Sequence, residues 1–298
     1  MGRILSLYKL RRMAQVLAYH VLPHETLSKL YYRIALREKP DLKNPRTLNE
    51  KLQWLKLHYY VNDPLAVQCS DKYQVRSYIA QKGLESKLTK LLGVWENAGD
   101  IDWDSLPDQF VLKCTHGCAY NIICKDKSSF DKAAAAKQLN KWLREDFAAF
   151  QVEIHYSKIK PRRIIAEEFL GDMLVDYKFF CFHGQPQFLY ISSDLIHGHQ
   201  AQIGFFDIDG RKLPLIRGDY KDIGDIEIPD CFAEMVEAAK VLSADFPFVR
   251  VDFFKTDTSY AFAELTFTPS AGMMSLNPKK YDFEWGALLD LSGIMKKN

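Results

Sequence analysis

The chain has 298 residues, of which 47% are hydrophobic, and it carries 40 lysines and arginines against 38 aspartates and glutamates. This composition suffices for a continuous core and excludes a disordered or collagen-like chain. The formal net charge of +2 excludes the overall field by which a strongly basic protein attracts nucleic acid. We therefore expect a folded protein with no nucleic-acid partner.

The N-terminal segment is amphipathic, and its charged residues before Glu25 are all basic. These residues divide the apolar side chains into runs shorter than the roughly 20 residues that span a bilayer, and no small-residue cleavage site follows. Two interpretations are open: a helix packed on the protein, or a peripheral helix on an anionic leaflet. Six scattered cysteines without a CxxC pair indicate a reducing compartment, so the predicted location is cytoplasmic.

Helical patterns dominate residues 1–87, which we assign to a mainly helical N-terminal region. Thr47 and Glu50 have the spacing of a capping box, which predicts the start of a helix. A second helix is predicted from Pro64, a residue typical of the first turn, to Gly83.

From residue 88 onward, short segments rich in β-branched and aromatic residues are bounded by Gly, Pro, Asp or Asn, a pattern typical of strands. The predicted strands lie in LTKLLGVW, QFVLKCTH, NIICKD, RRIIAEEFL, LVDYKFFCFHG, QPQFLYISS, AQIGFFDI, FPFVRVDFF and SYAFAELTF. Two predicted helices interrupt them, with caps expected at Ser128 or Ser129 and at Asp230. This order predicts an α+β fold with antiparallel sheets rather than a doubly wound parallel sheet.

The segment FVLKCTHGCAYNIICKD places Lys113 at the end of an apolar strand and Gly117 in the loop that follows. Loop amides, a glycine that permits close approach and a lysine charge suit phosphate, although an ordinary hairpin explains the same residues. Neither the P-loop pattern nor Gly-x-Gly-x-x-Gly is present. Cys114, His116 and Cys118 alternate along the chain, but they lack the paired spacing typical of zinc sites.

Two predicted strands near the C-terminus carry carboxylates that face each other. Arg250 and Asp252 share one strand face, and Glu264 and Thr266 share one face of the next strand. A turn centred on Thr258 places Asp252 opposite Glu264. Opposed like charges require a cation, and Mg²⁺ prefers oxygen ligands of this kind. Alternatively, the carboxylates are separate and Arg250 neutralises one of them in a salt bridge.

A third polar element lies in RRIIAEEFLGDMLVDYKFF. Glu167 and Glu168 end an apolar strand, and Asp176 and Lys178 share one face of the strand that follows. A strand, a connector with free backbone groups and a polar second strand suit a purine and its ribose. An ordinary hairpin with solvated charges is the alternative.

The segment DKYQVR, within the second predicted helix, carries Asp71, Lys72 and Arg76. These side chains either help to close a site and meet an anionic acceptor, or form a salt-bridged helix surface. The acidic pair in residues 207–209 precedes a glycine and predicts a hairpin turn rather than a glycosyltransferase motif.

Taken in order from Asn44 to Gly272, these segments resemble the TupA-like (teichuronopeptide biosynthesis) branch of the ATP-grasp superfamily. The resemblance implies an ATP-grasp fold, in which two α+β subdomains with antiparallel sheets clasp the nucleotide. The first subdomain would occupy residues 88–170 and carry the phosphate loop, and the second would occupy residues 171–298 and carry the metal-binding carboxylates. The implied cofactors are ATP and Mg²⁺.

The resemblance also implies a role for individual residues. Lys113, His116, Gly117 and Asn121 would contact the phosphates or belong to the loop over them; Glu167, Glu168, Phe169 and Leu170 would line the adenine site; Asp176 would hold the ribose; Lys178 and Arg250 would assist the transferring phosphoryl group; and Asp252 and Glu264 would bind Mg²⁺. Two departures are evident: Thr266 stands where many members have an asparagine, and the loop has a single glycine.

The implied activity is that of a carboxylate–amine ligase acting through an acyl phosphate. By analogy with the branch, the carboxylate would belong to a hexuronic acid of a surface polysaccharide or its lipid-linked precursor, and the amine to an amino acid. One alternative is a kinase for a sugar hydroxyl, with Asp194, His197 or His199 as its base. Another is a nucleotide-binding module without turnover.

Overall fold

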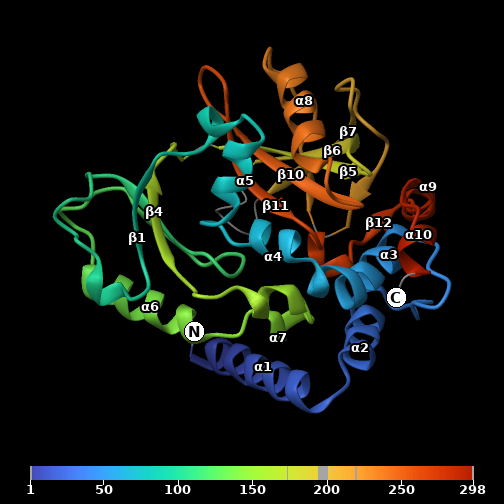
Figure 1. The fold of residues 1–298 in the computed structure, drawn as a ribbon, viewed down its shortest axis with the longest axis horizontal. Helices are drawn as coiled ribbons and strands as arrows, with labels where there is room; N and C mark the ends of the chain where they lie inside the picture. The colour runs from blue at the N-terminus through green and yellow to red at the C-terminus, as the bar shows by residue number, and fades with distance from the viewer. Residues whose placement is uncertain (1, 173, 194–200, 219, 297–298) are drawn as a thin grey trace.

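A computed structural model describes residues 2–172, 174–193, 201–218 and 220–296 (Figure 1). Each of the nine predicted strand segments contains a strand. The two larger sheets are antiparallel apart from one parallel pair, which confirms the predicted α+β class. The candidate bases Asp194, His197 and His199 lie outside the described residues.

The first sheet is antiparallel and has the order β1-β4-β2-β3. Its strands are β1 (Leu91–Trp95), β2 (Phe110–Cys114), β3 (Asn121–Cys124) and β4 (Ile164–Glu168). Alternate residues of β2, Phe110, Leu112 and Cys114, are buried in one cluster with Leu139 of helix α6 (Lys132–Arg144). The intervening β2 residues therefore point away from α6, towards the second sheet.

Helix α6 begins one turn later than the sequence predicts. Its cap is Asp131, whose carboxylate accepts a hydrogen bond from the Ala134 amide. The predicted caps Ser128 and Ser129 donate hydrogen bonds from their hydroxyls to the Asp126 carboxylate instead. These bonds stabilise a turn before the helix, so neither serine caps it.

The second sheet has the order β11-β10-β5-β6-β7-β9, and its β7–β9 pair is parallel. Its strands are β5 (Val175–Phe182), β6 (Gln185–Ser193), β7 (Gln202–Asp207), β9 (Lys221–Asp222), β10 (Phe248–Lys255) and β11 (Tyr260–Thr266). Helix α8 (Phe232–Ser243) packs on one face; its cap is Cys231, so the predicted cap Asp230 is wrong. A small sheet pairs β8 (Ile216–Arg217) with β12 (Leu276–Asn277).

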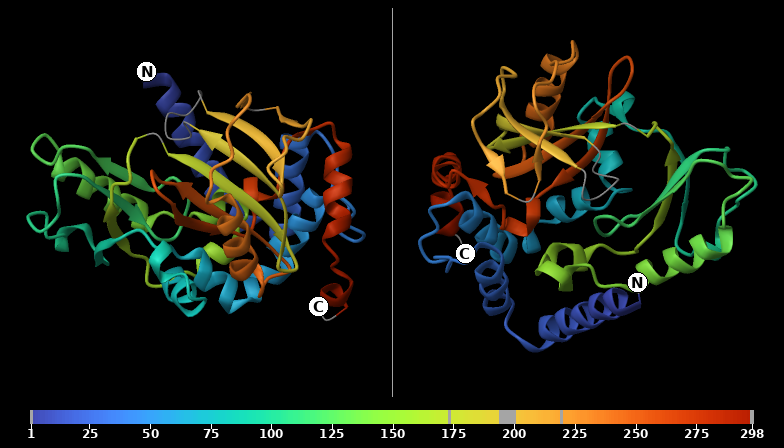
Figure 2. Two further views of the ribbon diagram at one scale, coloured as in Figure 1. Left: turned by 90° about the horizontal axis from the view of Figure 1, so that it is seen from above. Right: turned by 180° about the vertical axis from the view of Figure 1, so that it is seen from behind.

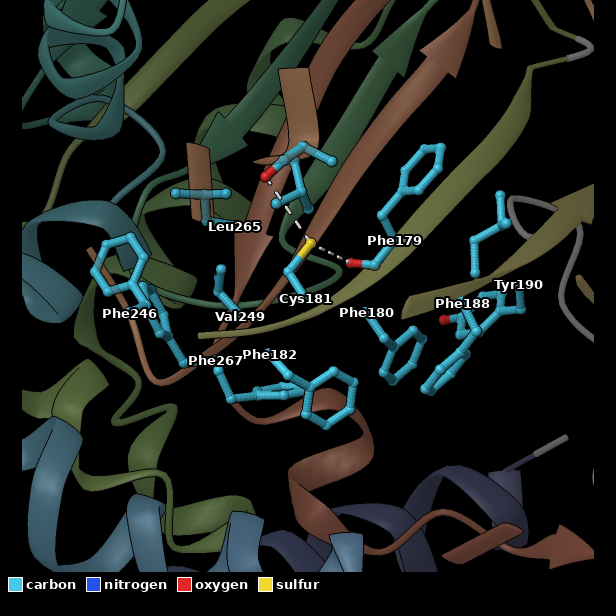
Figure 3. Packing of buried hydrophobic residues seen from close by; sticks show 14 of the residues in the cluster. Phe179, Phe180, Cys181, Phe182, Phe188, Tyr190, Phe246, Val249, Leu265 and Phe267 are labelled. Atoms are coloured by element: carbon cyan, nitrogen blue, oxygen red, sulfur yellow. Dashed lines mark hydrogen bonds between the residues drawn. The ribbon is translucent and has the colours of Figure 1, made fainter. Parts of the chain in front are cut away.

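Strand β5 sends alternate side chains to opposite sides of the second sheet (Figure 3). Phe179 packs against Phe232 of α8, with ring centroids 5.8 Å apart. Phe180 points the other way and stacks on Phe188 at 4.5 Å, and Phe188 stacks on Trp285 at 3.5 Å. Each fully buried ring of this kind contributes roughly 1.5–3 kcal/mol. This aromatic packing fixes the sheet on the side that also carries Asp176, Lys178 and Asp252.

Two hydrophobic clusters, one with Tyr19 and Leu27 and the other being the core of the second sheet, bury the N-terminal helices. These helices are α1 (Gly2–Val21), α2 (His24–Leu36), α3 (Leu48–Trp54), α4 (Pro64–Ser70) and α5 (Val75–Gln81), with a π-helical turn at Leu55–Tyr59 and short 3₁₀ turns at Tyr60–Asn62 and Glu85–Lys87. Thr47 and Glu50 form the predicted capping box at the start of α3. Buried Asn49 donates to Asp282 of the C-terminal helix α9 (Lys280–Leu288), which joins the two ends of the chain. The short helix α10 (Ser292–Met295) follows.

The second predicted helix is broken into α4 and α5 at Asp71, which is extended. Its carboxylate accepts hydrogen bonds from the Tyr73 and Gln74 amides, at 2.7 and 3.0 Å, and from the Thr115 hydroxyl at 3.2 Å. These partners replace the helical ones, so an unbroken helix is the wrong prediction here. Beyond α5, Gly83 has a φ of +77°, as expected of a residue that ends a helix.

Helix α1 packs on α7 (Ala148–Gln151). The Arg12 guanidinium lies 3.5 Å from the centroid of the Phe150 ring, and Gln15 donates to the Phe150 carbonyl at 2.9 Å. The interpretation of the N-terminal segment as a packed helix is therefore confirmed for this face. Within the described part of the chain, no helix has the length and apolar character needed to cross a membrane.

A buried histidine lies behind the second sheet, in the 3₁₀ turn Ile154–Lys158. His155 is fully buried, and neither of its ring nitrogens has a hydrogen-bond partner. Burial, and to a lesser extent the charge of Lys56, lowers its pKa from 6.5 to about 3. His155 is therefore neutral in the folded protein at neutral pH.

This histidine makes stability depend on pH. Below about pH 6.5, His155 is protonated in the unfolded chain but stays neutral in the folded protein. As the pH falls from about 6.5 to about 3, this difference lowers the free energy of unfolding by about 1.4 kcal/mol per pH unit. We expect the free energy of unfolding of His155→Phe, measured in urea, to fall less between pH 7 and 5 than that of the parent chain. The exposed His20→Gln is the control, and equal pH dependence in His155→Phe and the parent would contradict the assignment.

Candidate active site

A cavity of about 390 Å³ is lined by residues of both sheets and of the connector between β4 and β5. Its lining residues are Thr89, Val111, Lys113, Ala119, Asn121, Ile123, Glu168, Phe169, Leu170, Gly171, Asp172, Leu174, Asp176 and Phe254. Most of this lining is apolar, and a few polar side chains, among them Lys113 and Asp176, contribute to it. This composition suits a flat heteroaromatic ring joined to a polar group.

A second cavity of about 200 Å³ adjoins the first and shares Lys113, Ala119, Asn121, Asp176 and Phe254 with it. Lysines and carboxylates define this one: its lining adds Lys72, Cys118, Tyr120, Lys178, Ala263 and Glu264. The two cavities together place an apolar slot beside a charged chamber, an arrangement that matches a base and its phosphates.

Lys113 reaches this site from the β2 face that points away from α6. Its ammonium lies 2.6 Å from Glu167 of β4, and Arg76 of α5 lies 3.0 Å from the other oxygen of the same carboxylate. Arg76 also donates to the Thr89 carbonyl at 2.8 Å. Glu167 thus forms ion pairs with Lys113 and Arg76. Its neighbours Glu168, Phe169 and Leu170 line the first cavity.

The structure corrects the expectation for His116 and Gly117. Both are buried; His116 Nε2 lies 3.1 Å from the Trp142 carbonyl, and a side chain at Gly117 would meet the Phe147 ring at 2.8 Å. Burial lowers the His116 pKa to about 4, with a smaller effect from Arg162, so the ring is neutral at pH 7. These two residues anchor the loop to the core beside the first sheet. Ala119 and Asn121 line both cavities, and Cys118 and Tyr120 line the second one only.

The same loop offers no zinc site. Cys114 donates to the Leu139 carbonyl inside the core, whereas the Cys118 sulfur lies 3.9 Å from the Tyr156 hydroxyl. With His116 bound to Trp142, the three candidate ligands have different partners. Among the described residues, no group of three or more His, Cys, Asp or Glu side chains is placed to hold a metal ion.

The β10–β11 hairpin has the predicted register, with Asp252 directly opposite Glu264. Asp252 is fully buried and accepts hydrogen bonds from Arg250 at 2.7 and 2.6 Å and from Lys178 at 2.9 Å. Lys178 also donates to Asp176 at 2.9 Å. Burial works against the charge on Lys178, but Asp252 and Asp176 raise its pKa above the ordinary value. The Lys178 side chain is therefore positively charged at neutral pH.

Glu264 is the more accessible carboxylate, with 29% of its side chain exposed. Its partners are Arg250 at 3.3 Å, Lys72 at 3.5 Å and the Thr266 hydroxyl at 3.1 Å. Burial would raise its pKa, but Lys72, Lys178 and Arg250 outweigh burial and lower the pKa to about 2. Glu264 is thus ionised throughout the physiological range.

The carboxylate oxygens of Asp252 and Glu264 are ligands of the kind that Mg²⁺ prefers. The contacts of Arg250 bear on the two alternatives for this hairpin. Arg250 forms the salt bridge of the second alternative, but it bonds with both Asp252 and Glu264, and the two carboxylates are opposed rather than separate. The opposed carboxylates nevertheless require positive charge, which three side-chain cations supply here. Glu264 fits a hard cation directly, whereas Asp252 becomes a ligand only if Lys178 or Arg250 turns towards phosphate.

Several residues of the site were missed by sequence reasoning. Val111 and Ile123 lie opposite each other in the β2–β3 pair and both line the cavity, which a register drawn for that hairpin would have indicated. Tyr190 accepts a hydrogen bond from Arg250 at 3.2 Å, and no local pattern marks it. The pairing of Arg76 with Glu167 joins residues 91 positions apart, so only the fold reveals it.

Comparison with known families gives one extensive match. The family model described as TupA-like ATPgrasp matches residues 50–290. This range contains the lining residues of both cavities and the opposed carboxylates. No protein matches in a search of the curated proteins.

The chain also has distant likenesses among solved structures. The chain is similar to D-alanine–D-alanine ligase from Bacillus anthracis (16% identity, 78% of this chain and 70% of that chain, TM-score 0.49). It is also similar to D-alanine–D-alanine ligase from Coxiella burnetii (12% identity, 84% and 66%, TM-score 0.48) and to L-amino acid ligase from Bacillus licheniformis (13% identity, 75% and 49%, TM-score 0.43). The chain thus spans about half of the last of these ligases.

The position of Lys113 leads to a prediction about nucleotide affinity. Lys113→Ala removes a charge at the junction of the two cavities, and we expect it to weaken ATP binding about tenfold or more, the usual effect of losing a charge-assisted hydrogen bond. Calorimetric titration with ATP measures this. Lys141→Ala, which removes an ion-paired lysine of α6 outside both cavities, is the matched control. Equal affinities of parent and Lys113→Ala would rule out this phosphate contact.

Proposed function

We propose, from the premise that the chain belongs to the TupA-like ATP-grasp family, that it is an ATP-dependent carboxylate–amine ligase. The observation that carries the proposal is the apolar slot that opens onto a chamber lined by Lys72, Lys113 and Lys178. A slot of this kind suits adenine, and a cationic chamber beside it suits the triphosphate. The ATP-grasp fold supplies the slot and the chamber from two facing sheets.

The proposed reaction has two steps. An oxygen of the acceptor carboxylate attacks the γ-phosphorus of ATP. The bond between that phosphorus and the β–γ bridging oxygen breaks, and the products are an acyl phosphate and ADP. The amine nitrogen then attacks the acyl carbon, phosphate leaves, and the nitrogen loses a proton to form an amide. The first step requires alignment and charge neutralisation rather than a protein nucleophile.

The chain's own residues supply those two requirements. Lys113 would bind phosphate oxygens at the junction of the cavities, while Asp176 would hold the ribose. Arg250 is held by Asp252 and Tyr190, so its fork is oriented before substrate arrives. Lys178 and Arg250 would neutralise the transferring phosphoryl group without needing a proton.

Glu264 and Asp252 would hold Mg²⁺. When bound, the ion would screen the phosphate charge and act as a Lewis acid towards the γ-phosphoryl group. Thr266, which donates to Glu264 and accepts from Arg250, would orient these two side chains rather than replace a ligating amide.

We propose a hexuronic acid of a capsule or O-antigen polysaccharide, or of its lipid-linked precursor, as the carboxylate substrate. An amino acid or another amine would be the second substrate, and the reaction would take place in the cytoplasm. What supports this is the family membership together with the analogy drawn from its branch.

The deciding experiment is acceptor-dependent ATP turnover. Purified protein, Mg²⁺ and a panel of uronic-acid glycans are combined with and without an amino-acid pool, and ADP, free phosphate and product mass are followed together. We expect ADP and free phosphate with a mass gain equal to an amide-linked amine. ADP with phosphate retained on the sugar would identify a kinase, and absence of turnover despite ATP binding would indicate a binding module.

Substitution of Glu264 tests the metal assignment. Glu264→Gln keeps the shape but removes the charge, so we expect Mg²⁺-dependent turnover to fall about 100-fold or more and Mg²⁺ to lose its effect on ATP affinity in calorimetry. Glu237→Gln, on an exposed position of α8, is the control. Asp252→Asn is the weaker test because it also leaves two buried cations without a full partner. Unchanged turnover and unchanged Mg²⁺ dependence in Glu264→Gln would remove the assignment.

A further inference from the structure

Helix α1 has two faces of different character. The inner face packs on the protein through Arg12, Gln15 and the buried Tyr19. The opposite face carries apolar side chains that are 63–69% exposed, namely Leu10, Met13, Leu17 and Val21. Their spacing of three or four residues places all four on one line along the helix. The stripe is therefore continuous rather than a set of isolated surface residues.

Helix α2 extends the exposed apolar surface. Leu30 is 47% exposed and Ile34 is 68% exposed, whereas Tyr32, on another face of α2, is buried. Figures 1 and 2 show α1 and α2 forming a V along one edge of the molecule, with α8 at the opposite edge. Two amphipathic helices thus present apolar side chains at one edge.

The charges around this surface are predominantly positive. Residues 10–39 contain six lysines and arginines and two glutamates. The two acidic residues are neutralised by lysines, Glu25 by Lys29 and Glu38 by Lys279. Arg11, Arg33 and Arg37 are exposed beside the apolar side chains. An apolar stripe flanked by arginines complements a surface that is apolar within and negatively charged at its boundary.

We propose that the outer surface of α1 and α2 binds the face of a membrane leaflet rich in anionic lipid. The helices would lie in the plane of the leaflet, with the α1 stripe among the acyl chains and the arginines at the phosphates. A second copy of the chain is a poorer occupant, because its equally basic surface would be repelled. The two interpretations of the N-terminal segment then describe opposite faces of one helix, and the proposal does not rest on the ligase activity.

Vesicle co-sedimentation of the full chain tests the proposal. The probes are phosphatidylcholine vesicles and vesicles of equal parts phosphatidylcholine and phosphatidylglycerol. We expect binding to the anionic vesicles, weakened by salt, and about tenfold or greater weakening in the double variant Met13→Glu, Leu17→Glu. The matched control is the double variant Ile208→Glu, Val241→Glu, which places the same two charges at exposed apolar residues outside α1 and α2. Thermal melting of each variant verifies that it is folded.

Each other outcome overturns the proposal. Absence of binding to the anionic vesicles would do so, as would equal binding of the double variant and the parent, because the lipid contact would then lie elsewhere. Equal weakening by the control variant Ile208→Glu, Val241→Glu would show an effect of net charge rather than of this surface. A parent dimer that the double variant converts to monomers, without vesicle binding, would assign the surface to a second copy of the chain.

Discussion

The site depends on the burial of negative charge on the second sheet. Asp252 is fully buried on a strand whose neighbours in register are Glu264 and Lys178, and a buried carboxylate without a partner is strongly destabilising. Arg250 and Lys178 supply the positive charge that Asp252 needs, and Tyr190 accepts a further hydrogen bond from Arg250. The same arrangement that satisfies the folded chain holds Lys178 in the lining of the charged cavity and Arg250 against Glu264, another lining residue.

The N-terminal helices complete this charge pattern from outside the two sheets. Lys72 pairs with Glu264 of the second sheet, and Arg76 pairs with Glu167 of the first. Leu48 and Leu52 of α3 are buried with the aromatic residues of the second sheet, so the helices are fixed by the same core. The helical region is thereby part of the site rather than an appended unit.

Local patterns were sufficient where a residue's partners are near in sequence. The strand segments, the capping box at Thr47 and the pairing of Asp252 with Glu264 all follow from spacing, and the structure has each of them. The cap of α6 was predicted wrongly because of a neighbour, Asp126, which takes the hydroxyls of Ser128 and Ser129. Other predictions failed where a distant side chain contributes to the outcome. Asp71 breaks a helix because it binds Thr115, and His116 is buried because Trp142 accepts its hydrogen bond. No spacing along the chain encodes such contacts.

The break at Asp71 limits how far the two sheets can separate. Lys72 and Arg76 lie on a single short piece of chain, and four residues span at most about 14 Å even when fully extended. One of these side chains is bonded to each sheet. This piece of chain therefore tethers the two sheets at a fixed maximum separation. A wider opening must first break one of the two ion pairs, whose side chains are largely shielded from solvent.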